Sequence, residues 1–367
     1  LLLSGTGERL ARAAALGDSP NRITLLRDAD GDGVAETRHV LLDGLNHPFG
    51  MAMLDGTLYV GNTDGLVSFP YKDGDTRITA PAKRLASFKP GGHWTRSILP
   101  SKDGKRLYIG VGSLSNIADH GMEAEEGRAA IYEYDIASGA IRIFASGLRN
   151  PVGVAWEPNT DVLWTVVNER DGLGDETPPD YLTSVKDGGF YGWPYCYWNR
   201  IVDDRVPQDP ALVARAITPD YALGGHTASL GLCWMPAGTL PGFPDGMVIG
   251  QHGSWNRSKL SGYRVIFVPF ENGRRDLRPV RVATGGRLRR RRYLARHRLT
   301  RPALLTLGWQ DRAGKGLRSV ERNVNVGRRT CRAIQHDPHR PVRFAFRAPR
   351  RHCAGHARTR FRAPTLV

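Results

Sequence analysis

Between residues 20 and 286 the chain alternates short apolar segments with turns rich in glycine, aspartate, asparagine and proline. The apolar segments are enriched in β-branched and aromatic side chains, which is typical of strands. The turn residues supply the unusual φ angles that tight connections require. The pattern therefore predicts an all-β protein, in which residues 8–16 are the best helical candidate. The clearest predicted strands, each directly after a turn, are 57–61, 106–110, 162–167 and 247–250.

A recurring unit opens several of these strands with polar residues. Residues 46–52 (Asn-His-Pro-Phe-Gly-Met-Ala) resemble residues 149–155 (Arg-Asn-Pro-Val-Gly-Val-Ala), and looser copies begin at His93 and His226. Intervals of this kind suit the blades of a β-propeller with variable loops. Because one blade buries only part of its faces, neighbouring blades must pack around a ring. We therefore expect the strand-opening polar residues to converge at one mouth of a central channel.

The charge of the chain is distributed unevenly. The 367 residues contain 52 Lys+Arg and 36 Asp+Glu, for a formal net charge of +16. Residues 287–367 contain 23 of the basic residues, 22 of them Arg, and three of the acidic ones. The remaining 29 basic and 33 acidic residues give residues 1–286 a net charge of −4. The body is thus mildly acidic, which argues against a nucleic-acid partner for it. No run of about 18 apolar residues is present, so no transmembrane helix is expected.

The Arg-rich segment allows three interpretations. It could be a nucleic-acid-binding arm, a disordered solvated tail, or a stretch translated out of frame from a GC-rich gene. We favour the third, because such frames yield many Arg and few acidic residues. The predicted organisation is then an N-terminal remnant at 1–19, a propeller domain at 20–286 and a non-native or disordered tail at 287–367.

Two other classes of site find little support in the sequence. The body contains two cysteines, Cys196 and Cys233, and no CxxC spacing, so neither a zinc site nor a redox pair is expected. The sequence does not decide whether Cys196 and Cys233 form a disulfide. No GxGxxG follows a predicted strand, so nothing supports a pyridine-nucleotide enzyme.

Two longer motifs resemble the glucose/sorbosone dehydrogenase family. They are residues 147–153 (Gly-Leu-Arg-Asn-Pro-Val-Gly) and 186–194 (Lys-Asp-Gly-Gly-Phe-Tyr-Gly-Trp-Pro). Residues 28–33, 45–50 and 252–257 extend the match, and the last of these (His-Gly-Ser-Trp-Asn-Arg) is most similar to the L-sorbosone dehydrogenase-like branch. The resemblance covers roughly residues 20–285.

This resemblance implies a six-bladed propeller that binds pyrroloquinoline quinone (PQQ) and calcium. It implies oxidation of an aldose or an aldehyde sugar such as L-sorbosone, with electrons passing to an external quinone, cytochrome or dye. Family members are exported, so a periplasmic or cell-envelope location is expected by resemblance. Because the Arg-rich segment replaces a blade that the family places after 252–257, we expect an incomplete ring with damaged first and last blades.

The resemblance also implies roles for individual residues. His93 matches the catalytic histidine, and a neutral imidazole suits the removal of a hydroxyl proton. His47, His226 and His252 also open or end predicted strands, so the residues alone do not single out His93 as the base. Arg149 would stabilise negative charge on the reduced quinone. Asn150 and Arg257 would help to bind the quinone.

Two calcium sites are expected. In the family, main-chain carbonyls of the loop that matches Arg170 and Asp171 ligate the ion, although a cation at Arg170 departs from the family pattern. A separate structural calcium is predicted at a hairpin tip with carboxylates at alternating positions, or else the tip is a solvated acidic turn. The carboxylates of this second site are those of Asp28, Asp30, Asp32 and Glu36.

Several alternatives remain open at this point. A dense group of aromatic residues either packs a blade junction or lines a sugar-binding mouth. The protein could also be an inactive propeller or carbohydrate-binding module that no longer retains PQQ. A calcium-dependent lactone hydrolase is a third possibility that the backbone-ligand loop argues against. The aromatic residues are Tyr191, Trp193, Tyr195, Tyr197 and Trp198.

Overall fold

The computed structural model describes residues 20–271, 274–275, 281–284, 324–325 and 330–331. They belong to two units, one of residues 20–299 and 350–367 and the other of residues 1–19 and 300–349. In the second unit, β23 (Val324–Asn325) pairs with β24 (Thr330–Cys331) in an antiparallel ladder. The predicted helix at 8–16, the N-terminal remnant and the rest of the Arg-rich segment lie outside the described residues.

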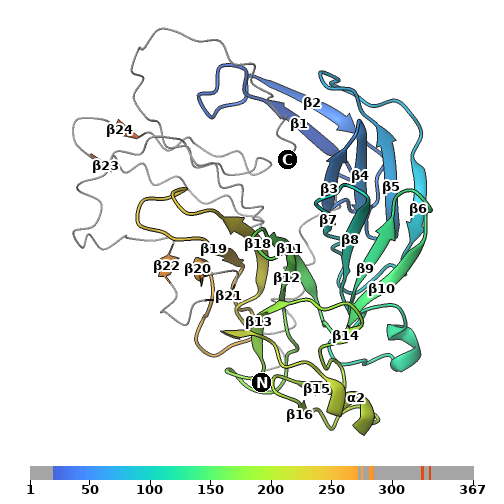
Figure 1. The fold of residues 1–367 in the computed structure, drawn as a ribbon, viewed down its shortest axis with the longest axis vertical. Coiled ribbons are helices and arrows are strands. Elements are labelled where there is room, and N and C mark those ends of the chain that lie inside the picture. The colour runs from blue at the N-terminus through green and yellow to red at the C-terminus, as the bar shows by residue number, and fades with distance from the viewer. Residues whose placement is uncertain (1–19, 272–273, 276–280, 285–323, 326–329, 332–367) are drawn as a thin grey trace. The chain divides into compact units, whose positions relative to one another are not determined.

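The described residues of the first unit form many strands and almost no helix, so the all-β prediction is confirmed. Its described residues form four sheets of four or five strands, drawn in Figure 1. The first sheet contains β3 (Gly50–Leu54), β4 (Thr57–Asn62), β5 (Gly65–Pro70) and β6 (Lys83–Ser87); the second contains β7 (Ile98–Pro100), β8 (Arg106–Val111), β9 (Ala130–Asp135), β10 (Ile141–Ser146) and β14 (Gly189–Phe190). The third contains β11 (Pro151–Glu157), β12 (Val162–Val167), β13 (Pro179–Ser184) and β17 (Tyr221–Gly225); the fourth contains β18 (Ser229–Met235), β19 (Gly246–Gln251), β20 (Arg264–Glu271), β21 (Arg274–Arg275) and β22 (Arg281–Thr284).

All four predicted strands are confirmed, as β4, β8, β12 and β19. Each is the second strand of its sheet, and most of its residues are buried. Burial on both faces explains why these segments are apolar runs and do not alternate with polar residues.

The remaining elements are small. A hairpin of β1 (Ile23–Arg27) and β2 (Thr37–Leu42) precedes the first sheet, and β15 (Cys196–Tyr197) pairs with β16 (Ile201–Val202). Described helix is limited to the 3-10 turn η1 (Met122–Glu125) and α2 (Pro210–Arg215), which Asp209 caps. Among the described residues, none of the helices has the length and apolar character needed to cross a membrane. Cys196 and Cys233 are both free thiols.

The four sheets pack side by side through their first strands, which gives a propeller-like arrangement. Strand β3 contacts β7, β11 contacts both β7 and β8, and β18 contacts β11 and β12. The core therefore lies in layers between neighbouring sheets. Leu66 and Ile109 pack between the first and second sheets, and Val166 and Ile249 between the third and fourth.

Glycine at the end of a second strand allows the next sheet to approach closely. A Cβ atom on Gly61 of β4 would lie 2.3 Å from the carbonyl oxygen of Arg96, just before β7. A Cβ atom on Gly110 of β8 would likewise lie 2.3 Å from the carbonyl oxygen of Pro151, which begins β11. Both distances are far shorter than any real Cβ contact, so only glycine permits this packing.

We predict that Gly61→Ala lowers the free energy of unfolding by about 1–3 kcal/mol, because the methyl group must push the backbone at Arg96 away. Urea unfolding of the purified chain measures the effect. Gly231→Ala is the matched control: it is also a strand glycine, but the nearest atom to its Cβ position is 3.5 Å away, an ordinary contact. Equal effects of the two substitutions would contradict the close-approach argument.

Candidate active site

The polar segments that the repeat predicts do open the first strand of each sheet. His47 lies just before β3, His93 before β7, Arg149 before β11 and His226 before β18. Backbone hydrogen bonds link two of these openings through Ser113, which follows β8. The carbonyl oxygen of Ser113 accepts from the His93 amide (3.0 Å), and its amide donates to the Arg149 carbonyl (2.8 Å). The structure thus brings His93 and Arg149 together at one edge of neighbouring sheets.

The tautomer of His93 follows from its hydrogen bonds. Its Nδ1 lies 2.9 Å from the Ser113 carbonyl oxygen and 3.0 Å from the Ser113 hydroxyl, which itself donates to the carbonyl oxygen of Ser115 (2.7 Å). A carbonyl oxygen can only accept, so Nδ1 carries the proton and Nε2 holds the lone pair of the neutral ring. Burial, followed by the charge of Arg149, lowers the pKa of His93 to about 3. His93 is therefore an uncharged base at neutral pH.

His93 and Asn150 both lie next to the side-chain position of Gly112. A Cβ atom on Gly112 would be 2.4 Å from Asn150 Oδ1 and 2.6 Å from His93 Cβ. Asn150 is only 5% exposed, and its Oδ1 has no hydrogen-bond partner among the described residues. A buried amide oxygen without a donor is costly. This side chain is therefore suited to a ligand with a hydrogen-bond donor.

The Arg149 guanidinium is buried and bonds mainly to the protein itself. Its Nε donates to the Asn116 carbonyl (3.1 Å), Nη1 to the carbonyls of Asn168 (3.1 Å) and Glu169 (2.9 Å), and Nη2 to Asn116 Oδ1 (3.0 Å). Of its five N–H groups, one on Nη2 remains for a ligand oxygen. Asn116 also exchanges two hydrogen bonds with the main chain of Asp171, at 2.8 and 3.0 Å. Sequence reasoning missed Asn116, whose only signal is its place after β8.

His226 differs from His93 in its protonation. Its Nδ1 lies 2.9 Å from Asp171 Oδ1 and its Nε2 lies 2.8 Å from the Gly174 carbonyl oxygen. Because both partners are acceptors, both ring nitrogens carry a proton and the ring is a cation. The hydrogen bond with Asp171 raises the pKa of His226; burial raises the pKa of Asp171, but His226 and Arg149 lower it further, to below its usual value. His226 is therefore an ion-pair partner and cannot act as a base.

The loop expected to ligate calcium is held from several sides. The Arg170 side chain turns into a buried pair with Asp203, with 2.9 Å between Nη1 and Oδ2, so its charge is compensated. The carbonyl oxygen of Asp171 accepts from Asn116 Nδ2. The carboxyl groups of Glu169 and Asp180 are buried beside this loop, and burial raises their pKa values to about 7 and about 6. Carbonyl oxygens surrounded by buried carboxyl groups suit a hard cation.

Arg257, between β19 and β20, also bonds to the third sheet and its loops. Its Nη1 donates to the Gly225 carbonyl oxygen (3.0 Å), and its Nη2 pairs with the Glu176 carboxylate. Its Nε is buried and has no hydrogen-bond partner in the described part of the chain. The buried Nε–H is thus available to an anion.

The acidic hairpin tip lies between β1 and β2, apart from these residues in the chain. Oxygen atoms of its four carboxylates, from Asp28, Asp30, Asp32 and Glu36, lie within 4.8 Å of one another. The same carboxylates accept hydrogen bonds from amides of the turn, among them Gly31 (2.7 Å) and Gly33 (2.8 Å) to Asp28. The tip thus gathers the carboxylates that were predicted to bind calcium.

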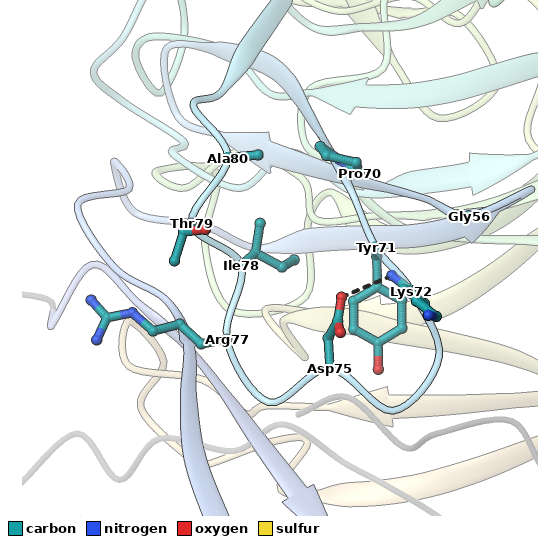
Figure 2. Close-up of a pocket in the computed structure, with 9 residues that line it drawn as sticks. All are labelled: Gly56, Pro70, Tyr71, Lys72, Asp75, Arg77, Ile78, Thr79 and Ala80. Carbon is teal, nitrogen blue, oxygen red and sulfur yellow. Dashed lines mark hydrogen bonds between the residues drawn. The ribbon is translucent and has the colours of Figure 1, made fainter.

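Two cavities lie near the first and second sheets. One of about 310 Å³, shown in Figure 2, lies by the turn at Gly56 and the loop after β5, where the Asp75 carboxylate accepts from the Lys72 amide. Because β3 runs from its polar opening to this turn, the cavity is at the opposite end of the sheet from His47. The second, of about 550 Å³, is lined by Glu125, Arg128 and Trp193, among others.

The dense aromatic residues mostly pack. Tyr191 and Trp193 are 3% and 4% exposed. Tyr195 contacts Phe190, and these two residues belong to one small apolar cluster. Trp193 reaches the site, because its Nε1 donates to the Asn116 carbonyl oxygen at 3.3 Å.

We predict that Glu169→Gln stabilises the chain at pH 8 and not at pH 4. The pKa of Glu169 is raised in the folded state, so the wild type loses stability as the pH rises from the unfolded-state pKa of 4.5 to about 7. An amide does not ionise, and the variant should gain about 1–3 kcal/mol at pH 8. Urea unfolding at both pH values measures this. A loss of stability at pH 8 would show that Glu169 is favourable as a carboxylate.

Comparisons with known proteins identify relatives of this chain. A pyrroloquinoline quinone-dependent sugar dehydrogenase of Hypocrea jecorina is 25% identical over 227 residues, which are 54% of this chain and 52% of that protein. An uncharacterized protein of Borreliella burgdorferi is 24% identical over 249 residues, 64% of each chain. The chain therefore spans less than two thirds of the length of these relatives.

Solved structures show the same fold. The iodide structure of Trichoderma reesei Carbohydrate-Active Enzymes Family AA12 superposes with a TM-score of 0.60 at 22% identity, over 68% of this chain and 73% of that chain. The holo form of the pyranose dehydrogenase PQQ domain from Coprinopsis cinerea gives 0.56 at 20% identity, over 72% and 73%. A family model described as TrAA12-like matches residues 21–210. The chain belongs to the TrAA12-like family and is related to PQQ-dependent sugar dehydrogenases.

Proposed function

We propose that this protein oxidises an aldose or an aldehyde sugar of the L-sorbosone type, with PQQ as the hydride acceptor and calcium as its Lewis acid. The observation that carries the proposal is the neutral His93 with Nε2 unprotonated, which lies beside Arg149 and Asn150. The names of the relatives support sugar oxidation with this cofactor.

The residues at the site fit the cofactor. The buried polar atoms that have no hydrogen-bond partner among the described residues include Asn150 Oδ1 and Arg257 Nε, and both belong to residues expected to bind the quinone. Arg149 keeps one N–H for a ligand oxygen. The main-chain carbonyls of Arg170 and Asp171 would hold calcium. When bound, the quinone supplies a carbonyl that accepts hydride, and the calcium ion polarises it.

The chain's own residues would accept the proton that the sugar hydroxyl loses. His93 Nε2 takes the proton of the sugar hydroxyl, and the Nδ1–H bond to Ser113 orients the ring and stabilises the cation that forms. The low pKa keeps His93 unprotonated but makes it a weak base. Because Arg149 contributes to this lowering, an anion that neutralises Arg149 raises the pKa of His93 toward the working pH.

The proposal also covers the rest of the molecule. It includes an incomplete six-bladed propeller, with damaged first and last blades, formed by a domain at residues 20–286 to which the four described sheets belong. It includes an external electron acceptor and a periplasmic or cell-envelope location.

A non-catalytic propeller is the second candidate function. It is favoured by the internal hydrogen bonds of Arg149, which use four of its five donors, and by the pair that Arg257 forms with Glu176. Such a protein would bind sugar without retaining PQQ.

We predict that the purified chain, after addition of PQQ and calcium, reduces a redox dye with aldoses or L-sorbosone. His93→Asn should lower kcat by about 100-fold or more, because the general base is lost while Nδ1-like hydrogen bonding is kept. Burial is the larger cause of the low pKa of His93 and remains when an anion neutralises Arg149, so the acid-side midpoint of activity should still lie below the ordinary histidine value of 6.5. Stopped spectrophotometric assays between pH 5 and 8 measure both effects.

The outcomes of this experiment separate the candidates. Sugar binding without PQQ binding supports the non-catalytic propeller. Turnover that survives in His93→Asn would remove His93 from the mechanism while leaving the cofactor assignment in place.

We predict that calcium stabilises the chain partly through the hairpin tip. At a free calcium concentration about 100 times the Kd, binding should add about 2.7 kcal/mol to the free energy of unfolding. The double substitution Asp30→Asn/Asp32→Asn should abolish the contribution of the tip, as measured by thermal unfolding with and without calcium. Magnesium is the control ion, because it needs a tighter octahedral site. An unchanged calcium response in the double variant would assign the whole effect to another site.

A further inference from the structure

Arg128 is a buried residue just before β9, and the proposed mechanism assigns no role to the hydrogen bonds of its guanidinium. Its guanidinium donates only to main-chain carbonyl oxygens, and among the described residues it forms no salt bridge with a carboxylate. Buried cations are normally paired, so an arrangement of six carbonyl acceptors points to a specific task. The acceptors are the carbonyls of Lys89 (2.7 Å), Pro90 (3.3 Å), Gly91 (2.7 Å), His93 (3.3 Å), Gly112 (3.1 Å) and Ser113 (3.2 Å).

These six carbonyls belong to two segments of the chain. Residues 89–93 lead from β6 toward β7 and end at His93, whereas residues 112–113 follow β8 and end at Ser113. Ser113 is the residue whose carbonyl accepts the Nδ1 proton of His93. Arg128 therefore binds the backbones of both partners in this hydrogen bond.

Arg96 shares part of this arrangement but has a different place in the fold. It donates to the carbonyls of His93 (2.8 Å) and Lys89 (3.2 Å), yet its own backbone packs against Gly50 and Gly61 of the first sheet. Replacing Arg96 would therefore disturb the packing of two sheets. Arg128 is the cleaner probe, because the hydrogen bonds of its guanidinium are confined to the segments that hold His93 and Ser113.

We propose that Arg128 is a positioning residue for His93. It holds residues 89–93 against Ser113, so that Nδ1 keeps its proton on the Ser113 carbonyl and Nε2 stays unprotonated. This inference rests on the proposed function only in taking His93 as the base in sugar oxidation. The tautomer itself is a property of the chain without cofactor.

The charges near His93 set the direction of the electrostatic effect. Arg149 and Arg128 lower the pKa of His93, whereas Asp171 raises it. Removing the charge of Arg128 should therefore shift the protonation midpoint of His93 upward, whereas a lysine at this position retains the charge but offers fewer donors in a less fixed geometry.

The test compares Arg128→Met and Arg128→Lys with the wild type. Nitrogen-15 NMR of the histidine-labelled chain without PQQ reports which ring nitrogen carries the proton, and the His93→Asn spectrum identifies the His93 signals. We expect a single Nδ1–H tautomer in the wild type, and mixed tautomers with a raised midpoint in Arg128→Met. We expect Arg128→Lys to lie between them in tautomer purity. Arg142→Met is the matched control, because this exposed arginine also donates several hydrogen bonds, to Glu133 and Asp187.

With PQQ and calcium present, Arg128→Met should lower kcat by about 10- to 100-fold and change KM for the sugar by less than about 3-fold, because a misplaced base slows the chemical step more than binding. Arg128→Lys should recover part of kcat, and Arg142→Met should match the wild type.

Several results would overturn the proposal. One such result is a folded Arg128→Met variant in which His93 keeps the tautomer and the protonation midpoint of the wild type. Another is an Arg128→Met variant that loses sugar affinity as much as it loses kcat. If Arg128→Met does not fold, Arg128→Lys decides by the same spectrum, and a pure Nδ1–H tautomer with reduced kcat would contradict the positioning role. If no variant or wild-type protein turns over sugar, the proposed function fails, whereas the NMR comparison still decides whether Arg128 sets the tautomer.

Discussion

Buried arginines that donate to main-chain carbonyls hold together the strand-opening end of this protein. Where the chain leaves one sheet and enters the next, its carbonyl oxygens lose their ladder partners while they remain buried, so each needs another donor. A guanidinium offers five donors in a rigid fork and can satisfy several carbonyls at once. Arg96 and Arg128 do this where the chain enters the second sheet, and Arg149 does it where the chain enters the third. The positions of His93, Asn116 and the loop expected to bind calcium all depend on these bonds.

The same arginines set the electrostatics of the site. They place positive charge around His93, which stays neutral, with its proton on the side of Ser113. Farther along the edge, Asp171 holds His226 as a cation. Two histidines that look alike in the repeat thus have opposite protonation, because one faces guanidinium groups and a carbonyl and the other faces a carboxylate. The arrangement gives one base and one ion-pair partner on the same edge.

Close packing of the sheets makes this edge possible. Glycines at the ends of β4 and β8 let the next sheet approach until its carbonyls almost touch the preceding strand. Gly112 extends this pattern one residue beyond β8 and lets His93 and Asn150 both approach a position without a side chain. A neutral histidine, a buried guanidinium and an amide oxygen without a partner among the described residues meet at this edge, and the proposed sugar oxidation would use them.

The amino-acid sequence by itself determined the strands and their openings. Apolar runs bounded by turn formers specify β4, β8, β12 and β19, and the repeated polar segments mark where each sheet begins, because both signals are local. The meeting of His93 with Arg149 also followed from the repeat. Only the tertiary structure decided which histidine is neutral, that Arg170 pairs with Asp203, and that Asn116 and Arg128 organise the site. These features depend on contacts between segments far apart in the chain, and protonation depends on the charges and burial that such contacts create.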